Sequence, residues 1–368
     1  MNSLNFFHTY VSPDAHIAVS DVLNSTMLSE GKLVAKFESE LQASLGLKNT
    51  VALNSGTSAL HLALVLAGVG EGDEVILPAQ TYIASGLAVK YVGATPVFAD
   101  IQYLTGNIDP VSIREKITQK TKAIMVVHWA GYPCDMTDIS AIAAEFGIPV
   151  IEDAAHALGA IYRGVPVGAI SELTCFSFQA IKHLTTGDGG GLSIKDESMV
   201  SVAKKLRWFG IDRASSSMSE LGERIYNADQ VGFKYHMNDY AAALGLSNLA
   251  GFKDRLAKVR NLADQYRKGL DTVSGIELFN NAKDRQSAYW LFGVHIDRRN
   301  DFVRKMKSVN IPVSVVHQRI DRNDVFGGLC DDLTIQEKFD ASQIHLPIHM
   351  GVNNEDVEMI VHEIKKGW

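Results

Sequence analysis

The chain has 368 residues, 46% of them hydrophobic and 21% charged, which is typical of a folded globular protein with a large core. The formal net charge of −7 argues against broad binding to nucleic acid or to an anionic membrane, although a local basic pocket for a phosphorylated ligand remains compatible with it. No apolar run is long enough for a transmembrane helix, and residues 1–8 lack the pattern of a secretory signal, so we expect a cytoplasmic protein.

The first segment with a chemical signature runs from Ala52 to Leu64 and reads as a short strand, a turn of small residues and a helix. Such a turn exposes backbone N–H groups at a helix N-terminus, which makes a ready phosphate site with Thr57 and Ser58 as the candidate donors. An ordinary Ser/Thr helix cap is the alternative interpretation of the same residues. Ser177, much later in the chain, could supply a further hydroxyl to the same phosphate.

Short β-rich runs then alternate with helical patterns. Runs predicted as strands are 73–78, 95–100, 123–128, 149–153 and 172–177, and apolar positions three and four apart predict helices over 58–68 and 138–146. This alternation favours an α/β fold with a mostly parallel sheet covered on both faces. Parallel strands place functional loops at their carboxyl ends, where Tyr82, Asp153 and Ser177 fall. The Tyr82 ring could stack on a planar cofactor, or it could be an ordinary core tyrosine.

Asp153 and Lys182 are the most informative residues of this region. Lys182 lies between a serine–aromatic pair, Ser177 and Phe178, and the glycine-rich turn 185–191. A nucleophilic lysine needs a fixed backbone and partial desolvation, so that its amine is neutral part of the time. A carboxylate at a strand end can hold a protonated ring nitrogen, as the pyridine of pyridoxal phosphate (PLP) requires. Each residue alone has a simpler interpretation, a surface lysine or a helix-capping acid.

No metal site is expected from the sequence. The three cysteines, Cys134, Cys175 and Cys330, are widely spaced and form no ligand or disulfide pattern, and Cys175 reads as a buried strand thiol. The histidines show no convincing metal spacing, because His345 and His349 flank a proline that rules out an ordinary helical pair.

The pattern of apolar and charged residues changes near residue 248. A long helical pattern over 249–270 leads into a strand at 289–296 and helices at 301–309 and 354–366. We therefore expect a large cofactor-binding domain, residues 1–249, and a smaller C-terminal α+β domain, residues 250–368.

Taken together, these segments resemble the sugar aminotransferases of the DegT/DnrJ/EryC1/StrS family, PLP enzymes of the aspartate aminotransferase fold type I. The likeness extends over nearly the whole chain and is carried by residues 29–32, 54–61, 152–156, 177–191, 231–239, 241–245, 289–291 and 345–351.

The resemblance implies a role for each matching residue. Lys182 would bind the cofactor covalently and move the proton, while Asp153 would pair with the pyridine nitrogen. Tyr82 would stack on the ring, and His156 would lie near the ring hydroxyl. Thr57, Ser58 and Ser177 would hold the phosphate. Gly31 and Lys32 would meet the sugar, and Lys234 would contact the phosphate or the substrate of a neighbouring subunit.

Three departures from the common pattern accompany this resemblance. Lys234 stands where many members have Asn, His236 replaces a common Arg, and Gln179 replaces a frequent His. The lysine at 182 argues against the branch of the family that uses a histidine there for dehydration.

The activity implied is transfer of an amino group from glutamate to a keto group of a nucleotide-linked deoxysugar for surface polysaccharide or glycan synthesis, with carbon 4 slightly favoured over carbon 3. A homodimer with its active site at the interface is implied as well, and closed two-fold dimers are the commonest soluble assembly. The alternatives are a PLP-dependent sugar dehydratase or elimination enzyme, and a PLP- or sugar-binding regulator without turnover.

Overall fold

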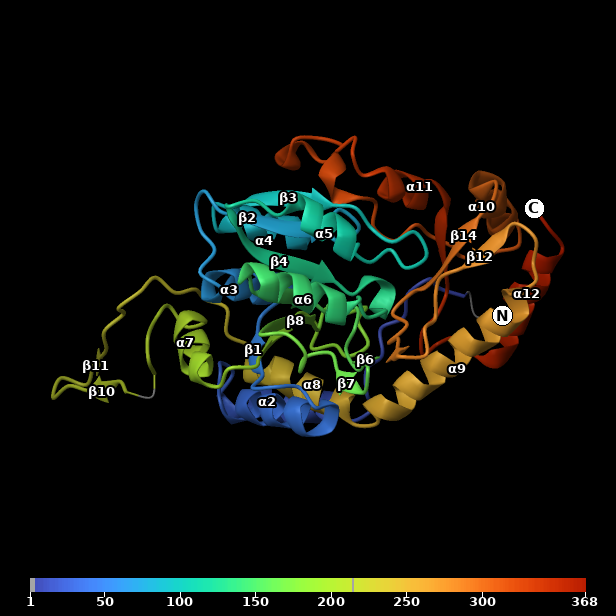
Figure 1. Ribbon diagram of the computed structural model, residues 1–368. Helices are drawn as coiled ribbons and strands as arrows, with labels where there is room; N and C mark the ends of the chain where they lie inside the picture. Colours follow the sequence, from blue (N-terminus) through green and yellow to red (C-terminus); the bar gives the residue numbers. More distant parts are fainter. Residues whose placement is uncertain (1–3, 214) are drawn as a thin grey trace.

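A computed structural model describes residues 4–213 and 215–368 (Figure 1). The α-helices in this part of the chain are α1 (Ala15–Ser25), α2 (Lys32–Leu45), α3 (Gly56–Leu66), α4 (Ile83–Tyr91), α5 (Pro110–Lys116), α6 (Met136–Phe146), α7 (Ser198–Leu206), α8 (Asp239–Leu249), α9 (Phe252–Leu270), α10 (Arg299–Ser308), α11 (Thr334–Ser342) and α12 (Asn354–Lys365). The strands are β1 (Val51–Leu53), β2 (Glu74–Pro78), β3 (Thr95–Ala99), β4 (Thr121–Val127), β5 (Val150–Asp153), β6 (Ile161–Tyr162), β7 (Val165–Pro166), β8 (Leu173–Ser177), β9 (Gly190–Ile194), β10 (Ser217–Met218), β11 (Arg224–Ile225), β12 (Ile276–Leu278), β13 (Arg285–Gln286), β14 (Phe292–Ile296) and β15 (Gln343–Leu346).

The main sheet has seven strands in the order β1-β9-β8-β5-β4-β2-β3. The pairs β2–β3, β2–β4, β4–β5 and β5–β8 are parallel, and β9 runs antiparallel to both of its neighbours. All five strands predicted from the sequence between residues 73 and 177 are present, and the expected α/β class is confirmed. Since β4, β5 and β8 are parallel, their carboxyl ends lie at the same edge of the sheet.

Helices cover both faces of this sheet because its strands are apolar on both sides. One core cluster joins strand residues such as Val75 and Leu77 to α3, α4 and α7, and a second joins Ile76, Ile124 and Val126 to α5 and α6. A third cluster packs α2 and α8 against Phe176 and its neighbours. Cys175 is buried in β8, as its apolar surroundings predict.

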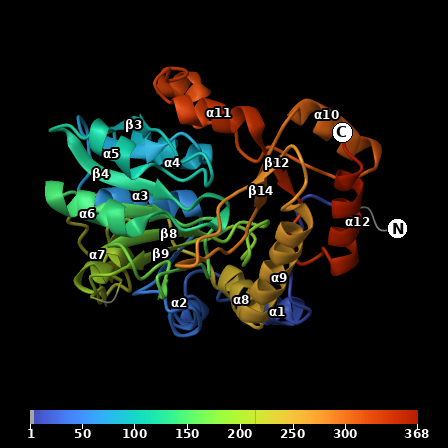
Figure 2. The ribbon, with the colours of Figure 1, turned by 45° about the vertical axis from the view of Figure 1, so that its right-hand side comes forward.

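The C-terminal part of the chain has its own sheet and core. Strands β12, β14 and β15 form an antiparallel sheet, and their apolar residues pack with α9, α10 and α12. Figures 1 and 2 show these elements gathered at one end of the molecule, beside the long helix α9. A capping box between Asn353 and Asp356 starts α12, close to the start at residue 354 that the sequence predicts. The division into 1–249 and 250–368 falls at the turn between α8 and α9, and we retain it as a proposal.

Two boundaries differ from the sequence expectations. The helical pattern over 249–270 is divided, because Ala250 leaves the helical region with a ψ of 128° and Gly251 follows with a left-handed φ of 67°. The strand expected from Tyr289 begins only at Phe292, because Tyr289 has a φ of 50°, which is outside the extended region.

One short hairpin, β10–β11, stands away from the rest of the molecule (Figure 1). Within residues 4–213 and 215–368, no helix has the length and apolar character needed to cross a membrane.

Candidate active site

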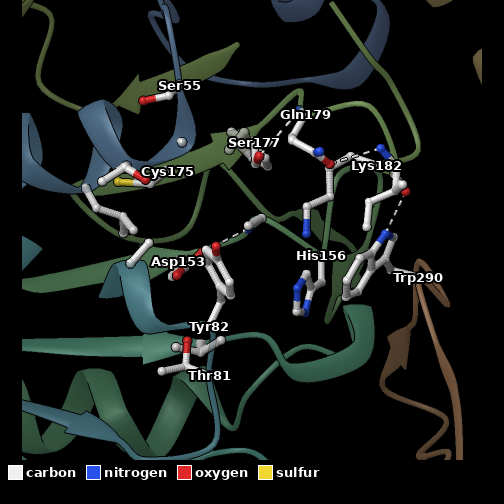
Figure 3. Close-up of a pocket in the computed structure, with 18 of the residues that line it drawn as sticks. Ser55, Thr81, Tyr82, Asp153, His156, Cys175, Ser177, Gln179, Lys182 and Trp290 are labelled. Atoms are coloured by element: carbon white, nitrogen blue, oxygen red, sulfur yellow. Dashed lines mark hydrogen bonds between the residues drawn. The ribbon is translucent and has the colours of Figure 1, made fainter. Parts of the chain in front are cut away.

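A cavity of about 370 Å³ opens at the carboxyl ends of β4, β5 and β8. Its wall includes six residues predicted from the sequence as a cofactor site, namely Thr57, Tyr82, Asp153, His156, Ser177 and Lys182. Figure 3 shows Asp153 and Ser177 extending from adjacent strands, with Lys182 on the loop that follows Ser177. Side chains separated by more than a hundred positions therefore meet at the sheet edge where ligands of open α/β sheets bind.

The N-terminus of α3 forms one end of the cavity. Ser55 caps this helix by accepting a hydrogen bond from the Ser58 N–H at 3.0 Å, while Gly56 and Thr57 face the cavity. A Cβ added to Gly56 would lie 2.9 Å from the Cβ of Ser177, so glycine is needed for the close approach of α3 to β8. The first N–H groups of a helix lack intrahelical partners, and this end of the cavity is therefore suited to a phosphate.

Ser58 takes a different place from the other two predicted phosphate ligands. Its hydroxyl donates to Oδ1 of Asn54 at 2.7 Å and lies 2.9 Å from the hydroxyl of Ser55. The side chain is buried and is not part of the cavity wall, whereas Thr57 and Ser177 are.

Asp153 ends β5 and is almost fully buried. Its Oδ2 accepts a hydrogen bond from the Ser85 hydroxyl at 2.8 Å, and its Oδ1 accepts one from the Ala155 N–H at 3.1 Å. Burial raises the pKa of Asp153, and both hydrogen bonds and the charge of Lys182 oppose that rise. Ser85, on α4, is a functional contact that the sequence analysis missed, since a serine within a helical pattern gives no signal of what it faces.

Lys182 is held on a tightly bonded loop. Its N–H donates to the Gln179 carbonyl at 2.9 Å, and the turn after it is tied down by the Thr186 N–H, which donates to the Phe178 carbonyl at 2.9 Å. Burial lowers the pKa of Lys182 to about 7, although the charge of Asp153 acts in the opposite direction. The amine is consequently present in both protonation states near neutral pH, which is the condition for a lysine that acts as a nucleophile and a proton carrier.

An aromatic wall completes the cavity. The His156 ring stacks on Trp290 with 3.8 Å between centroids and 18° between planes, and the His317 ring lies 4.9 Å from that of Tyr82. Burial lowers the pKa of His156 well below its usual value and that of His317 to about 4, so both rings are neutral at pH 7. Trp290 and His317 belong to the C-terminal part of the chain, and their place in the cavity was not predicted.

The remaining predicted residues lie outside this cavity. The Gly31 N–H donates to Oδ1 of Asp239 at 2.9 Å, and the exposed Lys32 begins α2. Lys234 is exposed as well, and its carbonyl accepts a hydrogen bond from the Asn54 side chain at 3.1 Å. The structure therefore does not bring Gly31, Lys32 or Lys234 to the cavity of their own chain.

The cavity fits PLP. It offers an amine with a lowered pKa, a buried carboxylate, a helix N-terminus with two neighbouring hydroxyls, and flat rings on its walls. His156 also keeps a buried Nδ1 for which no hydrogen-bond partner is found among the described residues, a polar atom available to a group in the cavity.

Fold and site together define a PLP-dependent aminotransferase. The chain belongs to the DegT/DnrJ/EryC1/StrS aminotransferase family, whose sequence model matches residues 11–365.

Two relatives match this chain over more than nine-tenths of its length. GDP-perosamine synthase of Caulobacter vibrioides is 34% identical over 351 residues, which cover 93% of this chain and 92% of the relative. UDP-4-amino-4-deoxy-L-arabinose–oxoglutarate aminotransferase of Shewanella sediminis is 32% identical over 370 residues, which cover 95% of this chain and 94% of the relative. The chain is thus similar to sugar aminotransferases over nearly its whole length.

Solved structures agree with this assignment. AtS13 from Actinomadura melliaura superposes with a TM-score of 0.95 at 36% identity and covers 100% of both chains. The PLP form of the putative sugar aminotransferase Spr1654 from Streptococcus pneumoniae superposes with a TM-score of 0.91 at 29% identity, covering 99% of this chain and 98% of that one. The expected cofactor, PLP, and the expected activity, a sugar transamination, are therefore confirmed.

Proposed function

We propose that the enzyme transfers the amino group of glutamate to a keto group of a nucleotide-linked deoxysugar, at carbon 4 rather than carbon 3, for the synthesis of a surface polysaccharide or glycan. The observation that carries the proposal is the meeting of Lys182 and Asp153 in one cavity, where the pKa of the lysine is lowered to about 7. The Shewanella relative named above supports the choice of carbon 4 and of glutamate as donor. Its name specifies a 4-amino-4-deoxy sugar and oxoglutarate, the keto acid that glutamate becomes.

When bound, PLP supplies an electron sink for the negative charge left on a substrate carbon that loses a proton. Lys182 removes that proton in the glutamate half of the reaction and returns a proton in the sugar half. Asp153 keeps the pyridine nitrogen protonated, and an opposite charge about 4 Å away contributes roughly 4 kcal/mol at an effective dielectric near 20.

The other chain residues bind and orient. The hydroxyls of Thr57 and Ser177 would hold the phosphate at the N-terminus of α3, and Ser58 supports that turn through Asn54 and Ser55. Tyr82 and His156 line the same cavity, where Tyr82 would pack against the cofactor ring and His156 would contact the ring hydroxyl. The aromatic wall around Trp290 keeps water away from the amine of Lys182.

Both substrates are anions, and a chain of net charge −7 has to concentrate positive charge locally to bind them. Lys32 and Lys234 are exposed and lie outside their own chain's cavity, which supports a contribution from each to the cavity of a second subunit in a homodimer. Arg163, a third basic candidate, pairs with Asp284 at 3.4 Å on the surface, which makes it the weakest of the three.

Two other functions compete with this proposal. A PLP-dependent sugar dehydration or elimination would use the same scaffold, but the lysine at 182 argues against the family's histidine-dependent dehydration. A regulator without turnover would not need an amine with a lowered pKa beside a buried carboxylate.

A screen of nucleotide-linked sugars tests the proposal. The purified protein, PLP and glutamate are incubated with matched 4-keto and 3-keto sugars carried on UDP, GDP and dTDP, and the products are read by mass spectrometry. We expect an amino sugar from a 4-keto substrate. Amination only at carbon 3 would overturn the positional choice, and loss of water without gain of nitrogen would favour the elimination alternative.

A further inference from the structure

Trp290 is held in an unusual backbone setting at the edge of the cavity. The residue before it, Tyr289, has a left-handed φ of 50°, and the Ala288 N–H donates to the Gly131 carbonyl at 2.9 Å. A Cβ on Gly131 would lie 3.1 Å from the backbone nitrogen of Trp290, so the glycine permits the turn at 288–290 to approach residue 131 closely. A non-glycine residue with positive φ persists only where its surroundings impose it. The indole of Trp290, the next residue, lies beside Lys182.

Two separate contacts join Trp290 to the lysine loop. The indole Nε1–H donates to the carbonyl of Ile181, the residue before Lys182, at 3.0 Å, and Figure 3 shows this bond. The Nζ of Lys182 lies 3.6 Å from the centroid of the Trp290 ring. The backbone and the amine of Lys182 are thus both held by one side chain.

The indole itself has little freedom to move. It is 4% exposed, its ring lies 3.8 Å from that of His156, and the Phe7 ring lies 5.5 Å away with 24° between planes. A side chain packed in this way can act as a fixed platform for its neighbour.

From this geometry we propose that Trp290 is a positioning residue for Lys182: its indole face holds the protonated amine whenever that amine is not bonded to the cofactor, and its N–H fixes the lysine backbone. The inference rests on the proposed role of Lys182, because in transamination this amine is released during each half of the cycle.

The electrostatic setting of Lys182 explains why such a platform is useful. Asp153 is the carboxylate whose charge favours the protonated amine, while His156, His317 and His183 face it with rings that burial keeps neutral. Burial lowers the pKa of Lys182 to about 7, so a released ammonium group has few favourable partners. The face of an indole carries negative potential and attracts a cation.

The test measures the pKa of Lys182 by competitive acetylation and peptide mass spectrometry in the full-length protein with pyridoxamine phosphate bound, where the lysine amine is free. Trp290→Phe retains an aromatic face, and Trp290→Leu removes it. We expect the pKa of Lys182 to be lower in the leucine variant than in the phenylalanine variant by about 0.4 to 1.5 units. Equal values, or a higher value in the leucine variant, would overturn the proposal.

A second measurement keeps the shape and the N–H unchanged. Replacing Trp290 with tryptophans carrying one to four fluorine atoms weakens the negative potential of the ring face stepwise, and the pKa of Lys182 should fall with each step. A flat series would mean that packing alone holds the lysine. Trp368→Leu is the matched control, because that indole donates to the Asp297 carbonyl at 2.8 Å far from the cavity and its loss should leave Lys182 unchanged.

These readouts do not require turnover, so they separate this inference from the proposed function. Failure of the sugar screen with a normal fluorine series would leave the Trp290 contact standing. A flat series in an active aminotransferase would remove only the role of Trp290.

Discussion

The hydroxyl of Ser85 donates a hydrogen bond to Oδ2 of Asp153 across 2.8 Å, joining α4 to the end of β5. Ser85 is completely buried, and its Oγ also lies 2.7 Å from the hydroxyl of Thr81. The contact fixes the orientation of the carboxylate and opposes the rise in its pKa that burial causes. The contact therefore orients the carboxylate that we propose faces the pyridine nitrogen, and it favours the ionised form of Asp153.

Replacing Asp153 with Asn tests the charge separately from the shape, because the amide has nearly the same size and keeps an acceptor for Ser85. Loss of a charge interaction of roughly 4 kcal/mol corresponds to a fall in kcat of about a thousandfold. Single-turnover kinetics with glutamate measures this fall as a lower rate of the glutamate half-reaction. An Asp153→Asn variant within tenfold of the parent would contradict the role given to this carboxylate.

Ser85→Ala should have a smaller effect of the same kind. A hydrogen bond to a charged group contributes about 1.5 to 3 kcal/mol, and its loss raises the pKa of Asp153. The protonated acid then persists to higher pH, so the acid limb of the plot of kcat against pH should shift to higher pH. A profile identical to that of the parent would show that Ser85 does not support the carboxylate.

The purified protein should be yellow, and Lys182→Ala should lose turnover by at least about a thousandfold while it still binds PLP through the phosphate site and Asp153. Borohydride reduction should attach the cofactor to the peptide that contains Lys182 in the parent and to no peptide in the variant. Lys195→Ala is the control, since that lysine pairs with Glu172 on the surface. Retained transamination by Lys182→Ala would refute the assignment of this lysine.

Much of the fold and part of the candidate site could be predicted, because the signals for them are local. Alternating apolar runs identified β2, β3, β4, β5 and β8, and the small residues around Gly56 marked a strand, turn and helix. Lys182 and Asp153 were recognisable because the residue types beside them restrict the backbone, and because Asp153 ends a predicted strand and Lys182 lies on the loop after another.

The rest depends on contacts between distant segments. Ser85 reaches Asp153 only after α4 packs on the sheet, and Trp290 and His317 reach the cavity only because the C-terminal part folds against it. The strand expected from Tyr289 failed for a related reason: the apolar pattern was correct, but tertiary contacts impose a φ of 50° on Tyr289. Such positions carry no local signal.

Replacing Lys182 with Met should stabilise the cofactor-free protein in a pH-dependent way. The folded pKa of about 7 is below the ordinary 10.5, so protonating the buried amine costs folding free energy. The gain in the free energy of unfolding from Lys182→Met should be complete below pH 7, shrink as the pH rises from 7 to 10.5, and vanish above pH 10.5. It should reach a few kcal/mol, since one pKa unit corresponds to about 1.4 kcal/mol.

Urea unfolding at pH 6.5 and pH 10 measures the difference. Lys195→Met, at an exposed lysine, should show no comparable change with pH. An equal gain from Lys182→Met at both pH values would mean that the pKa of Lys182 is not lowered by folding.

A shared active site in a homodimer makes a prediction of its own. Lys182→Ala and Lys234→Ala subunits, each inactive alone, should regain part of the parent activity after mixing, because one of the two sites in a mixed dimer then has both lysines. Native mass spectrometry confirms that mixed dimers have formed. No recovery in their presence would place Lys234 in the site of its own chain or remove it from the mechanism.

The most direct test of the central claim follows the nitrogen atom. Glutamate labelled with nitrogen-15 is incubated with the enzyme, PLP and the 4-keto nucleotide sugars, and the sugar product is analysed by mass spectrometry and NMR. We expect one labelled nitrogen on carbon 4 of the sugar and one equivalent of 2-oxoglutarate. If every ketosugar left the label on glutamate, or if the sugar lost water and gained no nitrogen, the proposed glutamate-to-ketosugar transfer would be contradicted.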